Sequence, residues 1–275
     1  MDSLAPTKTD EESGEGGERN FYAHAVEILT AHGIDFMIGG GHAFNAHTKM
    51  GRPSKDFDIF IHQEACADAL QVMQDAGYET ELTFPHWLGK SHSDGRTIDF
   101  IFGSGNGVAP VDDDWFTNAR AGELWGLPVL FCPVEELIWS KSFIMERERY
   151  DGSEIAHLLH SCAEDLDWPR LLARFGEHWP VLLSHLVLFH FIYPFDRHKM
   201  PLGVTQLLIR KLRTDLIEPP PERKICNGTL LSRAQYLVDI EDWGSLDGRL
   251  EPPGRKKKQE IEDWTNAMRE EGILD

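Results

Sequence analysis

The chain has 275 residues, of which 41% are hydrophobic and 27% charged, a composition that excludes disordered and fibrous proteins and favours a globular one. Its formal net charge of -19 disfavours non-specific binding to nucleic acids, because the acidic body repels their phosphates. The longest apolar run, residues 179–194, is interrupted by two histidines and a serine and is shorter than the ~20 residues of a membrane span. We therefore expect no membrane segment and interpret this run as a buried core helix.

The cysteines are too far apart in the sequence to suggest a pair of metal ligands. They are Cys66, Cys132, Cys162 and Cys226. The N-terminus also lacks the basic and apolar pattern of a signal peptide. We therefore expect four reduced cysteines in a cytoplasmic protein.

The first third of the chain alternates helices and strands. Residues 1–19 are acidic, glycine-rich and poor in large apolar side chains, which predicts a disordered tail. Residues 20–33 have apolar side chains at helical spacing and end on a glycine, as amphipathic helices do. A short strand over 35–40, a short helix over 42–48 and a buried strand over 56–61 are expected next.

Further strands are expected before Pro133. Residues 63–77 predict a helix with a glycine stop. Residues 86–93 and 96–103 predict two strands joined by the turn Ser93-Asp94-Gly95, and residues 127–131 a further strand.

The pattern changes to helices after Pro133. Helices are expected over residues 134–149, 151–163, 167–176, 180–193 and 203–216. The change predicts an α+β fold, with a mixed sheet and helices over 20–132 followed by a helical region over 133–217. We expect residues 218–275 to form an irregular C-terminal extension with a short final helix.

Two aspartates in the predicted strand over 56–61 are candidates for a metal site. Asp56 and Asp58 are two residues apart, so they point to the same face of a strand. Two like charges there repel each other unless a cation lies between them, and carboxylate pairs bind divalent cations. The alternative is that either residue is an ordinary turn or cap residue.

A third aspartate has a similar setting. Asp99 lies between Ile98 and Phe100 on a later predicted strand. If the two strands are neighbours in the sheet, the three carboxylates come together. Three carboxylates on neighbouring strands suit a two-metal phosphoryl-transfer site.

Three glycines, Gly39 to Gly41, separate the first predicted strand from the following helix. Glycine permits close approach of the backbone to a phosphate, and a helix N-terminus offers free N–H groups. A simple strand-to-helix turn would explain the glycines equally well if they stood alone. Their order before the aspartates favours a nucleotide site.

These motifs resemble the nucleotidyltransferase superfamily, whose members share a polymerase-beta-like core. The closer resemblance is to the small bacterial branch that includes antibiotic and toxin-type nucleotidyltransferases. The residues that match its pattern in order are Gly40, Gly41, Ala43, His47, Arg52, Ser54, Lys55, Asp56 and Asp58.

The resemblance implies a role for each group in the site. Asp56, Asp58 and Asp99 would bind two Mg²⁺ ions, and Asp99 would also deprotonate the acceptor. The nucleotide would be bound by Gly40, Gly41, His42, Lys55 and Lys141. His42 also fits a structural histidine, and Lys141 a solvated helix lysine.

The resemblance extends into the helical region and ends near Cys162. Asp151 would be a supporting acid beside Lys141. The run from Glu146 to Arg149 alternates in charge, which we interpret as a solvated helix face with salt bridges.

The predicted activity is Mg²⁺-dependent transfer of a nucleoside monophosphate from a nucleoside triphosphate to an acceptor hydroxyl, with release of pyrophosphate. One alternative is a catalytically inactive binding module of the same fold. Another is a toxin-type enzyme that modifies tRNA or protein, and a hydrolase using water as the acceptor is a further possibility. The acidic chain favours a small molecule or a protein hydroxyl over a nucleic acid as acceptor.

Overall fold

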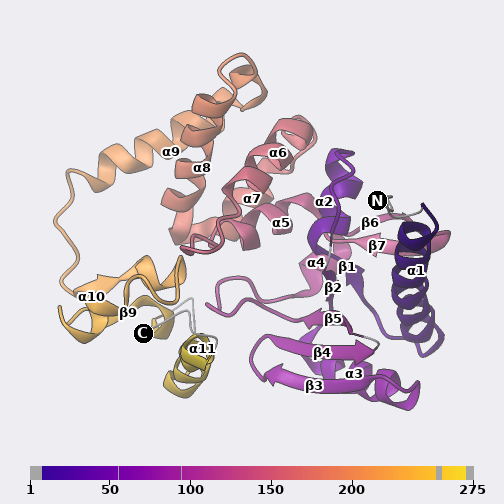
Figure 1. Cartoon of the computed structure of the whole chain (residues 1–275). Coiled ribbons are helices and arrows are strands. Elements are labelled where there is room, and N and C mark those ends of the chain that lie inside the picture. The colour runs from indigo at the N-terminus through magenta and orange to yellow at the C-terminus, as the bar shows by residue number, and fades with distance from the viewer. Residues whose placement is uncertain (1–7, 55, 94, 252–255, 271–275) are drawn as a thin grey trace, which may run out of the picture.

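A seven-stranded mixed sheet forms the N-terminal half of the protein, with strand order β3-β4-β5-β2-β1-β7-β6 (Figure 1). The computed structural model describes residues 8–54, 56–93, 95–251 and 256–270. The strands are β1 (Met37–Ile38), β2 (Phe57–Phe60), β3 (Glu79–Phe84), β4 (Leu88–Ser93), β5 (Arg96–Ile101), β6 (Arg120–Leu124) and β7 (Leu127–Phe131). β2 pairs with β5, and β1 with β7, in parallel, and the other neighbours are antiparallel. The expected mixed sheet is thus confirmed.

Helices surround the sheet and then continue as a separate region. Those of the first half are α1 (Lys8–Ala31), α2 (Gly40–Thr48), η1 (Gln63–Ala65), α3 (Cys66–Asp75) and α4 (Asp113–Thr117). Those of the helical region are α5 (Val134–Lys141), α6 (Gly152–Cys162), α7 (Trp168–Phe175), η2 (Gly176–His178), α8 (Trp179–Ile192), η3 (Arg197–Lys199) and α9 (Leu202–Asp215). The α+β fold expected from the sequence, a mixed sheet followed by helices, is confirmed.

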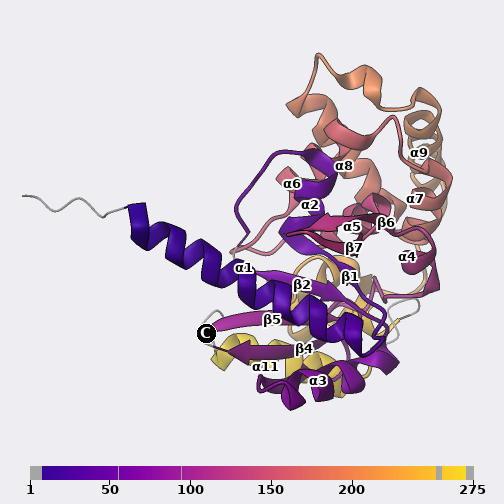
Figure 2. The same cartoon turned by 90° about the vertical axis from the view of Figure 1, so that its right-hand side faces the viewer.

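One face of the sheet is apolar and covered by α1 and α3. Figure 2 shows α1 crossing in front of the strands. Tyr22 of α1 stacks on Phe57 of β2 with ring centroids 4.6 Å apart. Ile98 and Phe100 of β5 are fully buried in the same core. Because side chains alternate along a strand, the residues between them point to the opposite face, towards the helical region.

The structure corrects the prediction of a disordered tail over residues 1–19. α1 begins at Lys8, so residues 8–19 are helical, whereas residues 1–7 lie outside the described part of the chain. The segment contains four glutamates, which have good helix propensity. It also continues into a helix that is already held by packing on the sheet, and extending a helix costs less than starting one.

Two strands of the seven-stranded sheet, β3 and β6, are not predicted from the sequence. Both lie at the edges of the sheet. An edge strand pairs on one side only and carries polar side chains more often than a central one, so an apolar pattern is not required. β3 carries Glu79 and Glu81, and β6 contains Gly122, all residues with low strand propensity.

The predicted helix over 134–149 ends early, at Lys141. The following residues form a tight loop in which Glu146 N–H donates to Arg149 O at 2.8 Å. Met145 N–H donates to Leu231 O at 3.0 Å, and Glu146 accepts from Ser232 Oγ at 2.5 Å. Contacts with the C-terminal extension therefore replace the helix that local propensity favours. The charges of this run do not form a solvated helix face.

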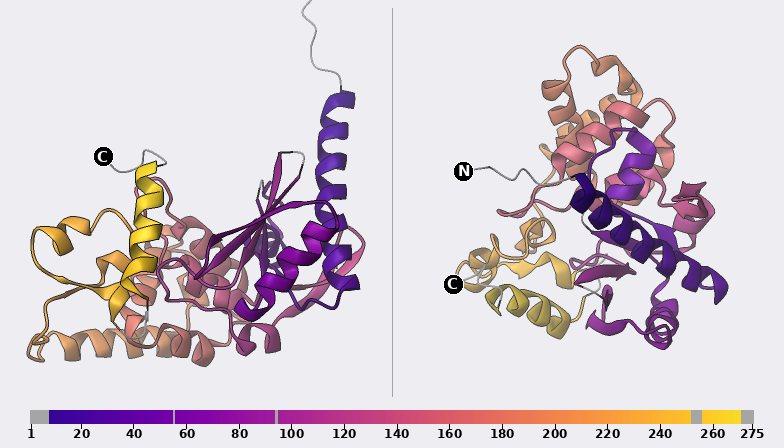
Figure 3. Two further views of the ribbon diagram at one scale, coloured as in Figure 1. Left: turned by 90° about the horizontal axis from the view of Figure 1, so that it is seen from below. Right: turned by 45° about the vertical axis from the view of Figure 1, so that its right-hand side comes forward.

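The C-terminal extension packs against the rest of the protein (Figure 3). Its elements are β8 (Ile225–Cys226), η4 (Asn227–Leu230), α10 (Leu237–Glu241), β9 (Leu246–Asp247), η5 (Gly248–Leu250) and α11 (Lys258–Glu270). Asn106, in the loop after β5, donates to Leu230 O at 2.6 Å. Arg249 is buried and binds Asp247 at 2.6 Å. The final helix α11 occupies the place where the sequence predicts one.

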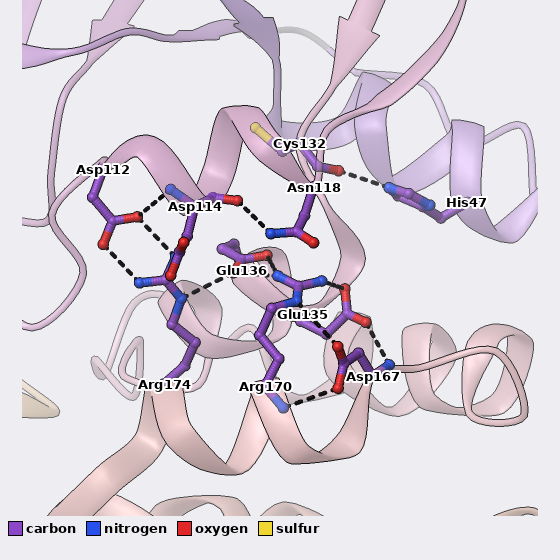
Figure 4. A network of polar contacts seen from close by, with 10 residues as sticks. All are labelled: His47, Asp112, Asp114, Asn118, Cys132, Glu135, Glu136, Asp167, Arg170 and Arg174. Carbon is purple, nitrogen blue, oxygen red and sulfur yellow. Dashed lines mark hydrogen bonds and ion pairs between the residues drawn. The ribbon is translucent and has the colours of Figure 1, made fainter.

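A buried network of charges joins α5 and α7 to α4 (Figure 4). Arg174 of α7 donates to Asp112 at 2.7 Å and to Glu136 of α5 at 3.0 Å. Arg170 binds both Glu135 and Glu136. Glu136 is fully buried, so its charge depends on these two arginines. The network fixes the helical region against the sheet.

α8 is the helix expected over 180–193. It buries Leu182, Leu186 and Phe189, as predicted, but leaves other apolar side chains exposed. None of the described helices is both long enough and apolar enough to cross a membrane.

Candidate functional site

Asp58 and Asp99 lie directly opposite each other on neighbouring strands. β2 and β5 run parallel, and their register pairs Asp58 with Asp99. The flanking residues Phe57, Ile59, Ile98 and Phe100 point into the core, so both aspartates point to the opposite face of the sheet. The structure thus brings together two of the three predicted carboxylates.

The beginning of α2 packs directly against the Asp58 carboxylate. Gly39 N–H donates to Asp58 O at 2.8 Å, which joins the end of β1 to β2. A Cβ atom at Gly40 would lie 1.7 Å from Asp58 Oδ2, and φ of Gly40 is +49°. A Cβ atom at Gly41 would lie 2.4 Å from Ser54 Oγ. Gly40 therefore favours glycine on both counts, whereas a side chain at Gly41 would have to displace Ser54, and the carboxylate lies beside backbone at the N-terminus of a helix.

The pKa of Asp58 is raised from 3.8 to about 6. Burial is the main cause, and the negative charges of Asp99 and Asp56 raise the pKa further. Lys141 and Arg149 act in the opposite direction but do not compensate. Burial and neighbouring negative charges thus both disfavour the ionised side chain, and a bound cation would favour it.

Asp56 is exposed and precedes β2 by one residue. Ser54 Oγ donates to its backbone oxygen at 3.0 Å. Its effect on the pKa of Asp58 places its charge near the pair. Lys55, the predicted nucleotide ligand between these two residues, lies outside the described residues.

Lys90 is a member of the site that sequence analysis missed. Its Nζ lies 3.0 Å from Asp99 Oδ1. β4 and β5 form a hairpin whose register pairs Lys90 with Asp99. Asp58, Asp99 and Lys90 therefore form a row across three strands. The hairpin turn was predicted, so counting back from it would have found this lysine.

Lys141 is buried and bound by two carboxylates. Its Nζ lies 3.0 Å from Asp151 and 2.7 Å from Glu154. Burial alone would lower the pKa of Lys141, but these two acids raise it. The lysine is therefore charged, and its positive charge reaches Asp58. It is not the solvated helix lysine of the alternative interpretation.

Two arginines complete this cationic cluster. Arg149 donates to both oxygens of Asp151 at 3.0 Å, and Arg52 lies 3.0 Å from Glu154. With Lys141, the cluster holds three cations against two carboxylates. Arg149 was interpreted as part of a solvated face, and its position follows from the loop after α5, which the sequence does not reveal.

His42 lies on the other side of the sheet from Asp58. Its ring contacts those of Phe57 and Trp125 edge-on, each with centroids 5.3 Å apart. Phe57 points into the core, opposite to Asp58. Burial lowers the pKa of His42, which favours the neutral form. This placement corrects the expectation that His42 faces the phosphates and fits the alternative of a structural histidine.

The carboxylates suit a divalent cation in their chemistry. Oxygen ligands are those that Mg²⁺ prefers, and the negative charges of Asp99 and Asp56 add to burial in raising the pKa of Asp58. Within the described residues, no three His, Cys, Asp or Glu side chains converge closely enough to enclose a metal ion. Asp99 in particular is held by Lys90. Asp56 and Asp58 are therefore the first candidates for a metal.

No protein-family model and no curated protein matches the chain. Among solved structures, the chain is similar to the antibiotic-resistance factor ANT(2'')-Ia, with 16% identity and a TM-score of 0.45 over 62% of this chain and 97% of that one. It is similar to the lincosamide antibiotic adenylyltransferase LnuA, with 15% identity and a TM-score of 0.37, over 51% of this chain and 94% of that chain. It is also similar to an antigenic nucleotidyltransferase-like protein from Paracoccidioides brasiliensis, with 18% identity and a TM-score of 0.33, over 58% of this chain and 88% of that chain.

These similarities concern the overall structure, whereas the chemistry of the protein depends on the geometry of the site. That geometry consists of the paired aspartates, the glycines at the start of α2 and the neighbouring cationic cluster.

Proposed function

We propose that this protein is a divalent-cation-dependent nucleotidyltransferase. It would transfer a nucleoside monophosphate from a nucleoside triphosphate to an acceptor hydroxyl and release pyrophosphate. The observation that carries this proposal is the register of Asp58 with Asp99, at a helix start that accepts only glycine beside the carboxylate. An adventitious pair of carboxylates would not need such a glycine.

Asp56 and Asp58 would hold one Mg²⁺ ion, with Asp99 beside them. We propose that a second Mg²⁺ ion binds at the same group of aspartates. The metal would supply positive charge to the triphosphate. Two carboxylates next to each other, one of them with a raised pKa, are costly in the free protein. That cost supports a role in binding a cation over a purely structural role.

The triphosphate would lie between the start of α2 and the cationic cluster. Backbone N–H groups of Gly40 and Gly41 are candidates for binding its oxygens, because the first N–H groups of a helix have no partner within the helix. Lys141 and Arg149 are fixed by Asp151 and bring positive charge towards Asp58. Fixed charges stabilise the developing charge of a transferring phosphoryl group without having to reorganise.

Asp99 is the candidate base. The acceptor oxygen would attack the α-phosphorus as its proton passes to the Asp99 carboxylate, and the bond from the α-phosphorus to the pyrophosphate oxygen would break. The ion pair with Lys90 fixes the orientation of Asp99 towards the site. Lys90 is thus proposed as a positioning residue.

The acceptor is proposed to be a small molecule or a protein side chain rather than a nucleic acid. The net charge of -19 opposes the approach of a polyanion. One similar structure is named for bound lincomycin and another for bound adenylyl-2''-tobramycin, and both of these ligands are small molecules. The reduced cysteines expected from the sequence support a cytoplasmic location.

A direct test uses the four nucleoside triphosphates labelled at the α-phosphorus, Mg²⁺ and a panel of hydroxyl compounds and proteins. Wild-type protein is expected to label an acceptor and release pyrophosphate, and Asp58→Asn and Asp99→Asn are expected to lose this activity. Asp113→Asn is the matched control, because Asp113 is fully exposed on α4. Full turnover by Asp58→Asn would contradict the proposal.

A further inference from the structure

The hairpin formed by α8 and α9 leaves a large apolar surface uncovered. α9 runs along the outer edge of the protein, away from the sheet (Figures 1 and 3). Phe191 is 83% exposed and Phe195 is 89% exposed at the end of α8, and Leu202 is 70% exposed at the start of α9. Monomeric proteins seldom expose adjoining apolar side chains of this size without a partner.

Four exposed apolar residues in and at the end of α9 lie at heptad spacing. They are Leu202, Ile209, Leu212 and Leu216, with the partly buried Thr205 between the first two; Leu207 is also exposed but lies outside this stripe. Leu216 is the C-cap and keeps a helical conformation, so the stripe is continuous along one side of the helix. Leu208, outside this stripe, is the one residue of α9 that is fully buried. Such a stripe is the pattern of a helix that packs along a second helix.

We propose that this stripe is the interface between two copies of the chain, with α9 packed antiparallel against α9 of the other copy. A helix hairpin paired with a second hairpin forms a four-helix bundle, in which the exposed faces of both become a core. Two-fold symmetric dimers are the commonest oligomers of soluble proteins, and their interface uses the same surface twice. This proposal does not depend on the proposed transferase activity.

The flanking side chains make the stripe compatible with itself. Antiparallel pairing places Ile209 of each copy against Leu212 of the other. It also brings Gln206 beside Arg213 of the other copy, so that an amide oxygen accepts from a guanidinium and no like charges meet. A second copy of the same chain therefore supplies both the apolar partner of Ile209 and the hydrogen-bonding partner of Gln206.

The distribution of charge makes the hairpin the least repulsive surface through which two copies can associate. Residues 179–217 contain five Lys and Arg and two Asp, a net +3, whereas the remaining residues carry -22. Two copies with a net charge of -19 repel each other at most orientations. Approach through the hairpins keeps the acidic bodies apart and leaves only the small like charge of the two hairpins to oppose the apolar contact.

The test is sedimentation equilibrium of the full chain over a range of concentrations. At about 50 µM we expect a species of twice the 31.3 kDa chain mass. Ile209→Glu should weaken the dimer by at least about 100-fold, because it buries two unpaired charges at the centre of the interface. Leu82→Glu is the control, since Leu82 is exposed to a similar degree on β3, far along the chain from α9.

Gln206→Lys is the second variant, because it changes an exposed position of α9 and keeps a good helix former. The new lysine would face Arg213 of the other copy. Because these like charges repel, we expect the dissociation constant of the dimer to rise about tenfold at low salt. A wild-type chain that stays monomeric at this concentration would overturn the proposal and assign the apolar surface to a different partner. A dimer unaffected by both Ile209→Glu and Gln206→Lys would overturn it as well.

Discussion

Asp58 of β2 and Asp99 of β5 are paired in register across two parallel strands, with the backbone of Gly40 against the Asp58 carboxylate. This relationship explains why two buried strands each carry an aspartate and why α2, which precedes β2, starts with glycines. It places like charges side by side in a partly buried position, which a stability-driven sequence avoids.

The first prediction concerns the pH dependence of stability in the metal-free protein. Because the pKa of Asp58 is raised from 3.8 to about 6 on folding, the native state binds more protons than the unfolded state between these values. The contribution of Asp58 to stability is therefore most favourable below pH 3.8 and falls as the pH rises through about 6. At about pH 7.5 the ionised side chain costs up to about 3 kcal/mol.

Asp58→Asn should thus stabilise the protein in the presence of a chelator, by up to about 3 kcal/mol at about pH 7.5 and hardly at all at about pH 4. Urea unfolding of both proteins at the two pH values measures the difference. Asp113→Asn, at an exposed position, should show no such pH-dependent gain. A loss of stability in Asp58→Asn at the higher pH would contradict the strained carboxylate pair.

The second prediction concerns Gly40. Gly40→Ala adds a Cβ atom 1.7 Å from Asp58 Oδ2 at a residue with φ of +49°, so the carboxylate must move. We expect a loss of stability of about 1–3 kcal/mol and at least about a 100-fold loss of transfer activity. Gly33→Ala is the matched control, because φ is +68° there but no atom lies within 4 Å of the added Cβ. Equal losses of activity in both variants would show that contact with Asp58 is unimportant.

The third prediction concerns the ion pair of Lys90 with Asp99. Lys90→Met removes the ammonium 3.0 Å from the carboxylate and leaves Asp99 without this compensating charge beside Asp58. We expect a loss of about 1 kcal/mol in the metal-free protein, since the pair is only partly buried. The loss should largely disappear in an Asp99→Asn background. Lys258→Met, which breaks an exposed i,i+4 pair, should change stability far less.

The fourth prediction concerns the buried network of Figure 4. Arg174→Met leaves the fully buried Glu136 with one arginine in place of two and removes the contact with Asp112. We expect destabilisation of about 3–5 kcal/mol in chemical unfolding. Arg223→Met is the comparison, because Arg223 makes a two-bond pair with Glu251 at the surface, and its loss should destabilise the protein far less. Similar losses in the two variants would argue against a structural role for the network.

The sequence predicted the parts of the site that depend on local pattern. The apolar runs around Asp58 and Asp99 identify buried strands, and the glycines identify the turn between strand and helix. Neighbouring strands were assumed for the two aspartates, and the register in β2 and β5 bears this out. The edge strands β3 and β6 were missed, because pairing on one side does not demand an apolar pattern.

Residues whose positions depend on tertiary contacts were harder to predict. Arg149 joins the cluster near Asp58 because the chain leaves α5 at Lys141, and that early end is fixed by contacts with the C-terminal extension. His42 follows the glycines in sequence, yet the turn of α2 directs its ring to Phe57 on the opposite face of the sheet. Neither fact is encoded in the spacing of the motif residues.

The most direct test of the proposed site is thermal unfolding of the wild type and of Asp58→Asn, each with Mg²⁺ and one of the four nucleoside triphosphates. A ligand that binds only the folded state raises the unfolding midpoint by mass action. The account predicts a rise in the wild type that requires both Mg²⁺ and a nucleotide, and its loss in Asp58→Asn, which remains folded. No rise with any nucleotide, or an equal rise in Asp58→Asn, would contradict it.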